Sequence, residues 1–183
     1  MHYARELSVR SRVRYDLPDT PLSKHIRKRN LDMHANRIVS SDAEQLILVD
    51  SEDRQIGTMA KSDCHDGNGI LHRAFSIFLF DNDGRLLLQQ RSPDKRLWPG
   101  YWSNSCCSHP RVGESMREAT GRRLLDELNI SAELEFVYKF SYQAKFADVG
   151  TEFELCSVYL GHVSGPVTVN DSEISAIRYL AAA

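Results

Sequence analysis

The stretch GESMREATGRRLLDELNI, from Gly113 to Ile130, decides the interpretation of the chain, because it predicts the one long helix. Ser115 is followed three residues later by Glu118, a capping box in which the two side chains satisfy free N–H groups of the first turn. Apolar residues at helical spacing form a stripe that would face a core: Met116, Leu124, Leu125 and Leu128.

Short apolar segments on both sides of this helix are typical of strands. Two of them are hairpin patterns, an apolar run followed by a polar turn and a return, at residues 45–59 and 72–91. The second contains the turn Asp81-Asn82-Asp83-Gly84. Further strands are expected at 134–143, 152–163 and, as two shorter pieces, 166–180. The order predicts an α+β domain with a mixed or antiparallel sheet.

The composition is that of one globular domain. The chain has 183 residues, of which 42% are apolar and 26% charged, enough for a single sizeable core. Residues 1–40 carry nine Lys or Arg against four Asp or Glu, so we expect a basic N-terminal extension. A solvated arm or a helix over the domain is favoured there, with targeting or an anionic partner as the alternative. Residues 41–183 are expected to form a single domain.

Charge and hydropathy exclude several classes of protein. A net charge of −2 does not suit a general nucleic-acid binder. No run approaches the roughly 20 apolar residues that span a bilayer, and the N-terminus lacks the apolar segment of a secretory signal. We therefore expect a cytoplasmic protein without a nucleic-acid or membrane partner, whose four cysteines are free thiols, ligands or packing residues.

Histidine and cysteine gather in two segments before the helix. In DCHDGNGILH, a glycine-rich turn either brings His65 and His72 to one point or leaves them as surface or packing residues. In WSNSCCSHP, Cys107 and His109 are two residues apart and share one face of an extended segment. Cys106 faces the other way and is expected to be a small buried packing residue.

Two carboxylates share one face of a later strand. In TEFEL, Glu152 and Glu154 repel each other unless a cation, a shared proton or open water separates them. Together with His65, His72 and His109 they suit a divalent ion such as Mn²⁺, Mg²⁺, Fe²⁺ or Zn²⁺. A structural zinc site is not favoured, because the CxxC spacing of such sites is absent.

Basic residues beside these clusters indicate an anionic ligand. If Lys61, Arg91, Lys95 and Arg123 converge, they form a pocket for a phosphate or diphosphate; taken singly, each is more simply a surface charge. Arg123 and Glu127 lie four apart on the helix. They form either a solvated ion pair or part of a site for phosphate or a carboxylate-held cation near the helix N-terminus.

The order of these motifs resembles the metal-dependent isopentenyl-diphosphate isomerases, which are built on the Nudix fold. The motifs HxxxxxxH, WPGYWSNSCCSHP, GES…RRLLDEL, Tyr142 and EFE occur in the family's order. The resemblance extends over roughly residues 45–179. It is specific, because several separate motifs keep near-family spacing.

The helix keeps a degenerate form of the Nudix pattern. Ser108 stands for the first glycine, and Glu114 and Glu127 keep two of the glutamates. Arg123 and Asp126 occupy positions where Nudix hydrolases have glutamates that hold several magnesium ions. Their replacement favours an isomerase over a hydrolase.

The resemblance implies a Nudix-like mixed β-sheet sandwich with a central Nudix helix and flanking helices. It also implies isomerisation of isopentenyl diphosphate to dimethylallyl diphosphate. The implied ligands of one divalent metal (Mn²⁺, Mg²⁺ or Zn²⁺) are His65, His72, His109, Glu152 and Glu154. The implied diphosphate contacts are Lys61, Arg91, Lys95 and Arg123, with Glu127 joining a Mg²⁺ that accompanies the substrate. Cys107 and Glu154 match the catalytic pair, with Tyr142 hydrogen-bonded near the glutamate.

Two other functions stay open. A Nudix-type diphosphohydrolase would keep the metal and the anion pocket but would not need Cys107. Family members usually continue into C-terminal helices with a tryptophan over the pocket, and Tyr179 to Ala183 offer no counterpart, so a catalytically weak prenyl-diphosphate binder is the other alternative. Trp98 and Trp102 would stabilise a carbocation or serve as core or rim residues. The protein is expected to be a monomer or a homodimer.

Overall fold

Nine strands and two helices build the part of the chain that the structure, a computed structural model, describes: residues 38–181. Their order is β1 (Gln45–Val49), β2 (Gln55–Ala60), α2 (Lys61–Cys64), β3 (His72–Phe80), β4 (Leu86–Arg91), β5 (Trp102–Ser103), β6 (Cys106–Ser108), α3 (Met116–Leu128), β7 (Leu134–Phe146), β8 (Gly150–His162) and β9 (Ile174–Leu180). This α+β order confirms the predicted fold class. Apart from α3, the only helix in this range is the single turn α2. The expected basic extension, residues 1–40, falls outside the described residues except for its last three.

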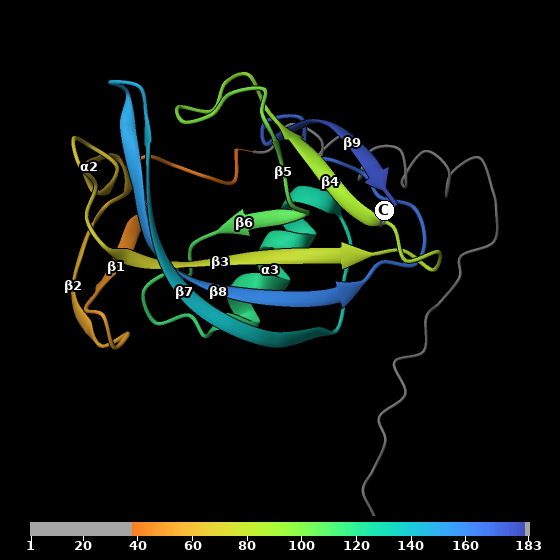
Figure 1. Ribbon diagram of the computed structural model, residues 1–183, viewed down its shortest axis with the longest axis horizontal. Helices are drawn as coiled ribbons and strands as arrows, with labels where there is room; N and C mark the ends of the chain where they lie inside the picture. The colour runs from red at the N-terminus through yellow and green to blue at the C-terminus, as the bar shows by residue number, and fades with distance from the viewer. Residues whose placement is uncertain (1–37, 182–183) are drawn as a thin grey trace, which may run out of the picture.

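Strand β3 is the centre of the sheet. It pairs in parallel with β8 along its whole length, from His72 opposite Glu154 to Phe80 opposite His162. Its other partners, β1, β4 and β6, run antiparallel to it, and β7 pairs with β8 as a long antiparallel hairpin. The sheet is therefore mixed, as the sequence indicated, and Figure 1 shows β6, β3, β8 and β7 side by side.

The predicted hairpin at residues 72–91 forms only at its turn. Asp81 Oδ1 accepts hydrogen bonds from the backbone N–H groups of Asp83 and Arg85, which closes the turn. Beyond the pair Phe80 and Leu86, however, β3 and β4 separate. The sides of β3 are taken by β8 and β6, whereas β4 pairs with β9 and β5. The strands were predicted, but their partners were not.

Helix α3 covers one face of the central strands (Figure 1). Its predicted capping box is present: Ser115 Oγ accepts from the Glu118 backbone N–H, and the Glu118 side chain accepts from the Ser115 backbone N–H. Leu124 and Leu128 are fully buried, and each such side chain contributes roughly 1.5–3 kcal/mol. Leu125, expected in the same stripe, is 50% exposed, because it lies a quarter turn away from Leu124.

The core under α3 fixes the strands that carry the polar motifs. It contains residues of β3, β4, β6, α3 and β9, and one residue just after β8: Phe75, Ile77, Leu79, Leu87, Cys106, Ala119, Leu124, Leu128, Ile174 and Val163. Because Cys106 belongs to this core, the next residue of β6 points to the opposite side of the sheet. Across residues 38–181, no helix combines the length and apolar character that crossing a membrane requires.

Candidate active site and metal centre

A cavity of about 920 Å³ collects side chains from β3, β4, β6, β7, β8 and α3. Its wall contains every residue predicted for catalysis or anion binding: Cys107, Glu154, Tyr142, Lys61, Arg91, Lys95 and Arg123. The predicted metal ligands on the wall are His65, His109, Glu127, Glu152 and Glu154, and His72 is fully buried beside them. Segments that are far apart in the sequence therefore meet at one place.

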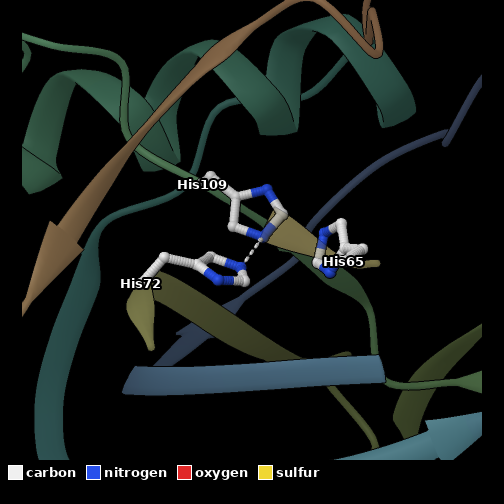
Figure 2. Close-up of side chains that lie close together, drawn as sticks. All are labelled: His65, His72 and His109. Atoms are coloured by element: carbon white, nitrogen blue, oxygen red, sulfur yellow. Dashed lines mark hydrogen bonds between the residues drawn. The ribbon is translucent and has the colours of Figure 1, made fainter. Parts of the chain in front are cut away.

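The three histidines surround a common point, as Figure 2 shows. Their nearest ring nitrogens all lie within 4.8 Å of one another. The Nε2 atoms of His72 and His109 are 3.2 Å apart, and Glu154 Oε1 lies 3.2 Å from His109 Nε2. All three side chains are buried.

Backbone carbonyls orient two of the rings. His72 Nδ1 lies 2.7 Å from the carbonyl oxygen of Ile70, and His65 Nδ1 lies 3.2 Å from that of Thr151. A carbonyl accepts only, so each Nδ1 carries the hydrogen and Nε2 is left with a free lone pair. This arrangement is typical of metal-binding histidines, whose outer nitrogen donates to a carbonyl or carboxylate.

His65 and His109 stay neutral at physiological pH. Burial, followed by the neighbouring His109 and His72, lowers the pKa of His65 to about 3. Burial also lowers the pKa of His109 to about 4, against the opposing effect of Glu154. Neutral imidazole is the form that binds a metal, so these two ligands do not have to lose a proton first.

Two carboxylates of β8 complete the cluster. The hydroxyl of Tyr142 on β7 lies 2.9 Å from Glu152 Oε2 and 2.8 Å from Glu154 Oε2. Burial, followed by the charge of Glu154, raises the pKa of Glu152 to about 7. Burial also acts to raise the pKa of Glu154, but the neighbouring rings of His109 and His72 outweigh it and lower that pKa. Of the two carboxyl groups, Glu152 therefore holds a proton more readily, and Glu154 is ionised.

The chemistry of these donors fits a divalent cation. Three imidazole nitrogens and a carboxylate oxygen converge on one point, and a second carboxylate stands beside them. Mixed nitrogen and oxygen ligands suit first-row divalent metals. The group can therefore hold one such ion, as the sequence predicted.

The thiol of Cys107 is held on the cavity wall by three polar neighbours. Cys107 Sγ donates to Asn104 Oδ1 at 2.7 Å and lies 3.4 Å from Ser76 Oγ and 3.9 Å from Ser103 Oγ. Asn104 is itself fixed, because its Nδ2 donates to the backbone carbonyls of Ile77 and Cys106. Burial raises the pKa of Cys107 to about 11, so the thiol is protonated at neutral pH.

Cys106 behaves as the sequence indicated. It is fully buried in the core under α3, although its Sγ also lies 3.4 Å from Glu127 Oε1. The two adjacent thiols therefore face opposite sides of β6. Every cysteine among residues 38–181 is a free thiol.

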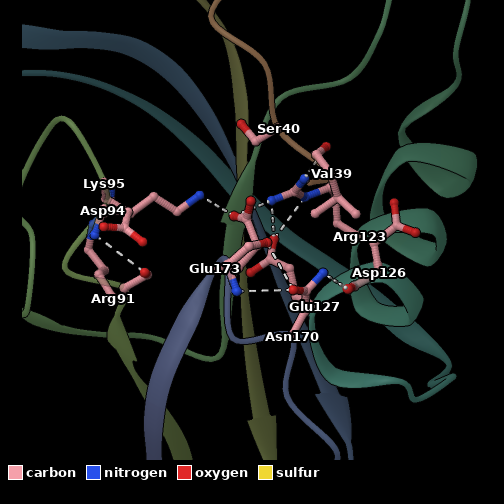
Figure 3. A network of polar contacts seen from close by, with 12 residues as sticks. Val39, Ser40, Arg91, Asp94, Lys95, Arg123, Asp126, Glu127, Asn170 and Glu173 are labelled. Atoms are coloured by element: carbon pink, nitrogen blue, oxygen red, sulfur yellow. Dashed lines mark hydrogen bonds and ion pairs between the residues drawn. The ribbon is translucent and has the colours of Figure 1, made fainter. Parts of the chain in front are cut away.

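The predicted anion-binding residues line one cavity, but their side chains already have partners within the protein. Arg123 is 3% exposed, and its Nε donates to Glu127 Oε1 at 2.8 Å while its Nη2 lies 3.0 Å from Glu173 Oε2. Lys95 also pairs with Glu173. Lys61 Nζ donates to Ser40 Oγ at 2.5 Å. Figure 3 shows how these charges alternate across the network.

Three residues of the site were not anticipated from the sequence: Ser76, Asn104 and Glu173. Ser76 and Asn104 contact the Cys107 thiol, and Glu173 joins two of the cations. Ser76 and Glu173 belong to no motif with a fixed spacing. Asn104 stands inside WSNSCCSHP, three residues before the thiol, and this proximity is the one signal that could have pointed to it.

Comparison with known proteins supports the same interpretation. Residues 70–183 match the NUDIX domain family. Isopentenyl-diphosphate Delta-isomerase 1 of Photorhabdus laumondii is 46% identical over 135 residues, which cover 73% of this chain and 77% of that protein. Isopentenyl-diphosphate Delta-isomerase of Serratia proteamaculans is 51% identical over 122 residues, covering 67% and 68%.

Solved structures share the fold at lower identity. DR0079 from Deinococcus radiodurans superposes with a TM-score of 0.61 at 24% identity, covering 75% of this chain and 83% of that one. A MutT protein from Methanosarcina mazei gives 0.53 at 17% identity, covering 60% and 76%. These likenesses concern the fold alone.

The fold, the capped helix α3 and the buried cavity beside it define a Nudix-type domain. Within that class, the identity to the two bacterial isomerases over two thirds or more of the chain is decisive. The chain belongs to the isopentenyl-diphosphate Delta-isomerase family of Nudix proteins.

Proposed function

We propose that this chain converts isopentenyl diphosphate to dimethylallyl diphosphate in the cavity between Cys107 and Glu154. One observation carries the proposal: a thiol, a Tyr–Glu pair and a set of cations line the same cavity. A hydrolase would use the cations and the metal cluster but would have no role for the thiol. Family membership supports the same reaction.

The reaction needs two proton-transfer groups. The terminal carbon of the double bond gains a proton, a tertiary carbocation forms, and C2 then loses a proton. Positioned acid and base groups accelerate such steps, and a site closed to water protects the cation. The Cys107 thiol and the Glu154 carboxyl group are the two groups we assign to these transfers, with Tyr142 hydrogen-bonded to Glu154.

The neighbours of each group favour these roles. Asn104 and Ser76 fix the position of the Cys107 sulfur, and burial keeps its proton in place. Tyr142 joins Glu152 to Glu154, so a proton can pass between the phenol and either carboxyl group. The proposal assigns the two residues without assigning which one adds the proton and which one removes it.

The histidine and glutamate cluster is proposed as the site of one divalent ion, Mn²⁺, Mg²⁺ or Zn²⁺. Its ligands would be His65, His72, His109, Glu152 and Glu154. The ion would offset the repulsion between the two carboxylates. The β3–β8 pairing, which sets His72 opposite Glu154, supports this assignment.

The diphosphate is assigned to the basic side of the cavity. Lys61, Arg91, Lys95 and Arg123 would bind it, with a Mg²⁺ shared between the diphosphate and Glu127. Trp98 and Trp102 also line the cavity and would face the hydrocarbon part of the substrate. We propose a cytoplasmic enzyme that acts on this small molecule as a monomer or a homodimer, with no nucleic-acid or membrane partner.

Proton NMR in D₂O tests the activity directly. The protein is incubated with isopentenyl diphosphate and Mg²⁺, before and after metal stripping. We expect the methyl signals of dimethylallyl diphosphate, incorporation of deuterium, and loss of both after stripping. Release of phosphate would indicate a diphosphohydrolase, and an unchanged spectrum after hours would indicate a binder without catalysis.

A further inference from the structure

Glu173 lies inside the cavity between two of the cations assigned to the diphosphate. Its Oε2 pairs with Lys95 Nζ and lies 3.0 Å from Arg123 Nη2 (Figure 3). The Glu173 side chain is 6% exposed, and that of Arg123 is 3% exposed. A carboxylate therefore occupies the centre of a site whose ligand is an anion.

The backbone around Glu173 holds this carboxylate in place. Asn170 begins the turn, where its N–H donates to the Glu127 carbonyl at 2.9 Å and its Nδ2 donates to the Asp126 carbonyl at 3.2 Å. Glu173 N–H donates to the Asn170 carbonyl, and the Glu173 carbonyl accepts from Ser92 N–H, both at 2.9 Å. The turn is thus attached to the end of α3 on one side and to the loop after β4 on the other.

The carboxylate is ionised. Burial by itself would raise the pKa of Glu173, but Arg123 and Lys95 outweigh burial and hold the pKa below its ordinary value. The ion pairs Lys95–Glu173, Glu173–Arg123 and Arg123–Glu127 follow one another, so cations and carboxylates alternate along the network.

A fixed negative charge at this point changes which anions the pocket favours. A diphosphate entering the site has to share Lys95 and Arg123 with Glu173, and the two anions repel each other at short range. A divalent ion on the diphosphate lowers its charge and reduces this repulsion. Without Glu173, the cations would repel each other and would attract a free diphosphate more strongly.

We propose that Glu173 is a positioning residue that holds Lys95 and Arg123 at the diphosphate site and makes the pocket prefer metal-complexed diphosphate over the free anion. The inference rests on the assignment of this cavity to a diphosphate. It concerns binding selectivity, and so it can be tested separately from catalysis.

The test uses Glu173→Gln in the metal-loaded protein, with inorganic diphosphate as the probe. Calorimetry gives the dissociation constant with saturating Mg²⁺ and without added Mg²⁺. The selectivity is the constant without added Mg²⁺ divided by the constant with saturating Mg²⁺. We expect Glu173→Gln to lower this ratio roughly tenfold by tightening the binding of the free anion. Glu173→Asp keeps the charge and should retain the ratio of the unmodified protein.

Asp94→Asn is the matched control. Asp94 is an exposed carboxylate on the wall of the same cavity, and within the described residues it makes no ion pair with Lys95 or Arg123. Its neutralisation should leave the ratio unchanged, because solvent and salt screen an exposed charge. A ratio for Glu173→Gln within twofold of the unmodified protein would overturn the inference, as would an unmodified protein without any preference.

Turnover provides a second readout. With saturating Mg²⁺, Glu173→Gln should lower kcat for isomerisation about tenfold without raising KM, and Glu173→Asp should restore much of it. A purely structural role would lower the melting temperature and leave the selectivity ratio intact, which would count against the proposal. If the protein shows the Mg²⁺ preference but forms no product, the proposed function fails while the binding inference stands.

Discussion

The hydroxyl of Tyr142 lies 2.8 Å from Glu154 Oε2, and the same oxygen lies 2.9 Å from Glu152 Oε2. One phenol on β7 therefore joins both carboxylates of β8. The register of the hairpin explains the contact, since Tyr142 stands opposite Glu154 in the ladder and Glu152 is the next residue on the same face. A single phenolic hydrogen can serve only one carboxylate at a time, which makes the hydroxyl a natural relay.

Replacement of Tyr142 by Phe removes this proposed relay while keeping the ring. We expect kcat for isomerisation to fall roughly 10²-fold with little change in KM, because proton transfer and not substrate binding is affected. Tyr138→Phe is the control, since Tyr138 is on the same strand and 53% exposed. Steady-state kinetics distinguish the two variants, and equal activity in both would show that the hydroxyl has no part in the reaction.

Replacement of Cys107 by Ala should lower the rate of isomerisation by at least about 10²-fold, because one of the two proposed proton-transfer groups is lost. The D₂O NMR assay measures this, and circular dichroism checks that the variant folds. Cys64→Ala is the control, a buried thiol that does not line the cavity. Full isomerase activity in Cys107→Ala would contradict the assignment, whether or not the variant also hydrolyses the diphosphate.

Replacement of His72 by Asn should remove the bound metal, because His72 is central to the histidine cluster. Elemental analysis of the purified protein should show about one divalent ion per chain before the change and far less after it. Loss of the ion should also lower the melting temperature by roughly 5–10 °C. His162→Asn, at the exposed end of β8, should change neither value. Full metal content in His72→Asn would disprove the site.

Replacement of Glu114 by Gln should loosen the loop that carries His109. Arg122 donates to both oxygens of Glu114, at 2.7 and 2.8 Å, and its Nη2 also lies 3.4 Å from the His109 carbonyl. We expect the free energy of unfolding to fall by about 1 kcal/mol and metal affinity to fall roughly tenfold. Glu135→Gln, an exposed carboxylate on β7, should leave both unchanged.

The same pair predicts a pH dependence. The hydrogen bond from Arg122 holds the pKa of Glu114 below its ordinary value. The stabilisation is therefore present above the unfolded-state pKa of about 4.3 and is lost as pH falls through the lower folded value. Urea denaturation at several pH values should show the unmodified protein losing its advantage over Glu114→Gln below about pH 4. A constant difference down to pH 2 would argue against this ion pair.

The helix and the strands could be predicted because their signals are local. The Ser115–Glu118 box and the buried Leu124 and Leu128 follow directly from spacing, and so do the strands around residues 45–59 and 134–163. The short strand expected within residues 166–169 is absent. That segment instead lies against the C-terminal end of α3, where Thr168 N–H donates to the Leu128 carbonyl. Hydrophobic alternation does not say which strand a segment pairs with.

The candidate ligands could also be named from the sequence, since few residue types bind metals or transfer protons. The residues that position them could not. Asn104 contacts the Cys107 sulfur only because β6 pairs with β3, and Glu173 reaches Lys95 only because its turn is attached to α3 and to Ser92. Asparagine and glutamate in a polar turn are otherwise typical of any surface loop.

The sequence by itself determined the chemistry of this protein: three histidines, two glutamates, one candidate reactive thiol and a set of cations, each at a spacing that places it on a given face of its own element. The tertiary structure alone decided that they share one cavity, because the parallel pairing of β3 with β8 sets His72 opposite Glu154. It alone also placed the Glu173 carboxylate among the cations. Long-range pairing and burial set these distances, and neither is encoded in any single segment.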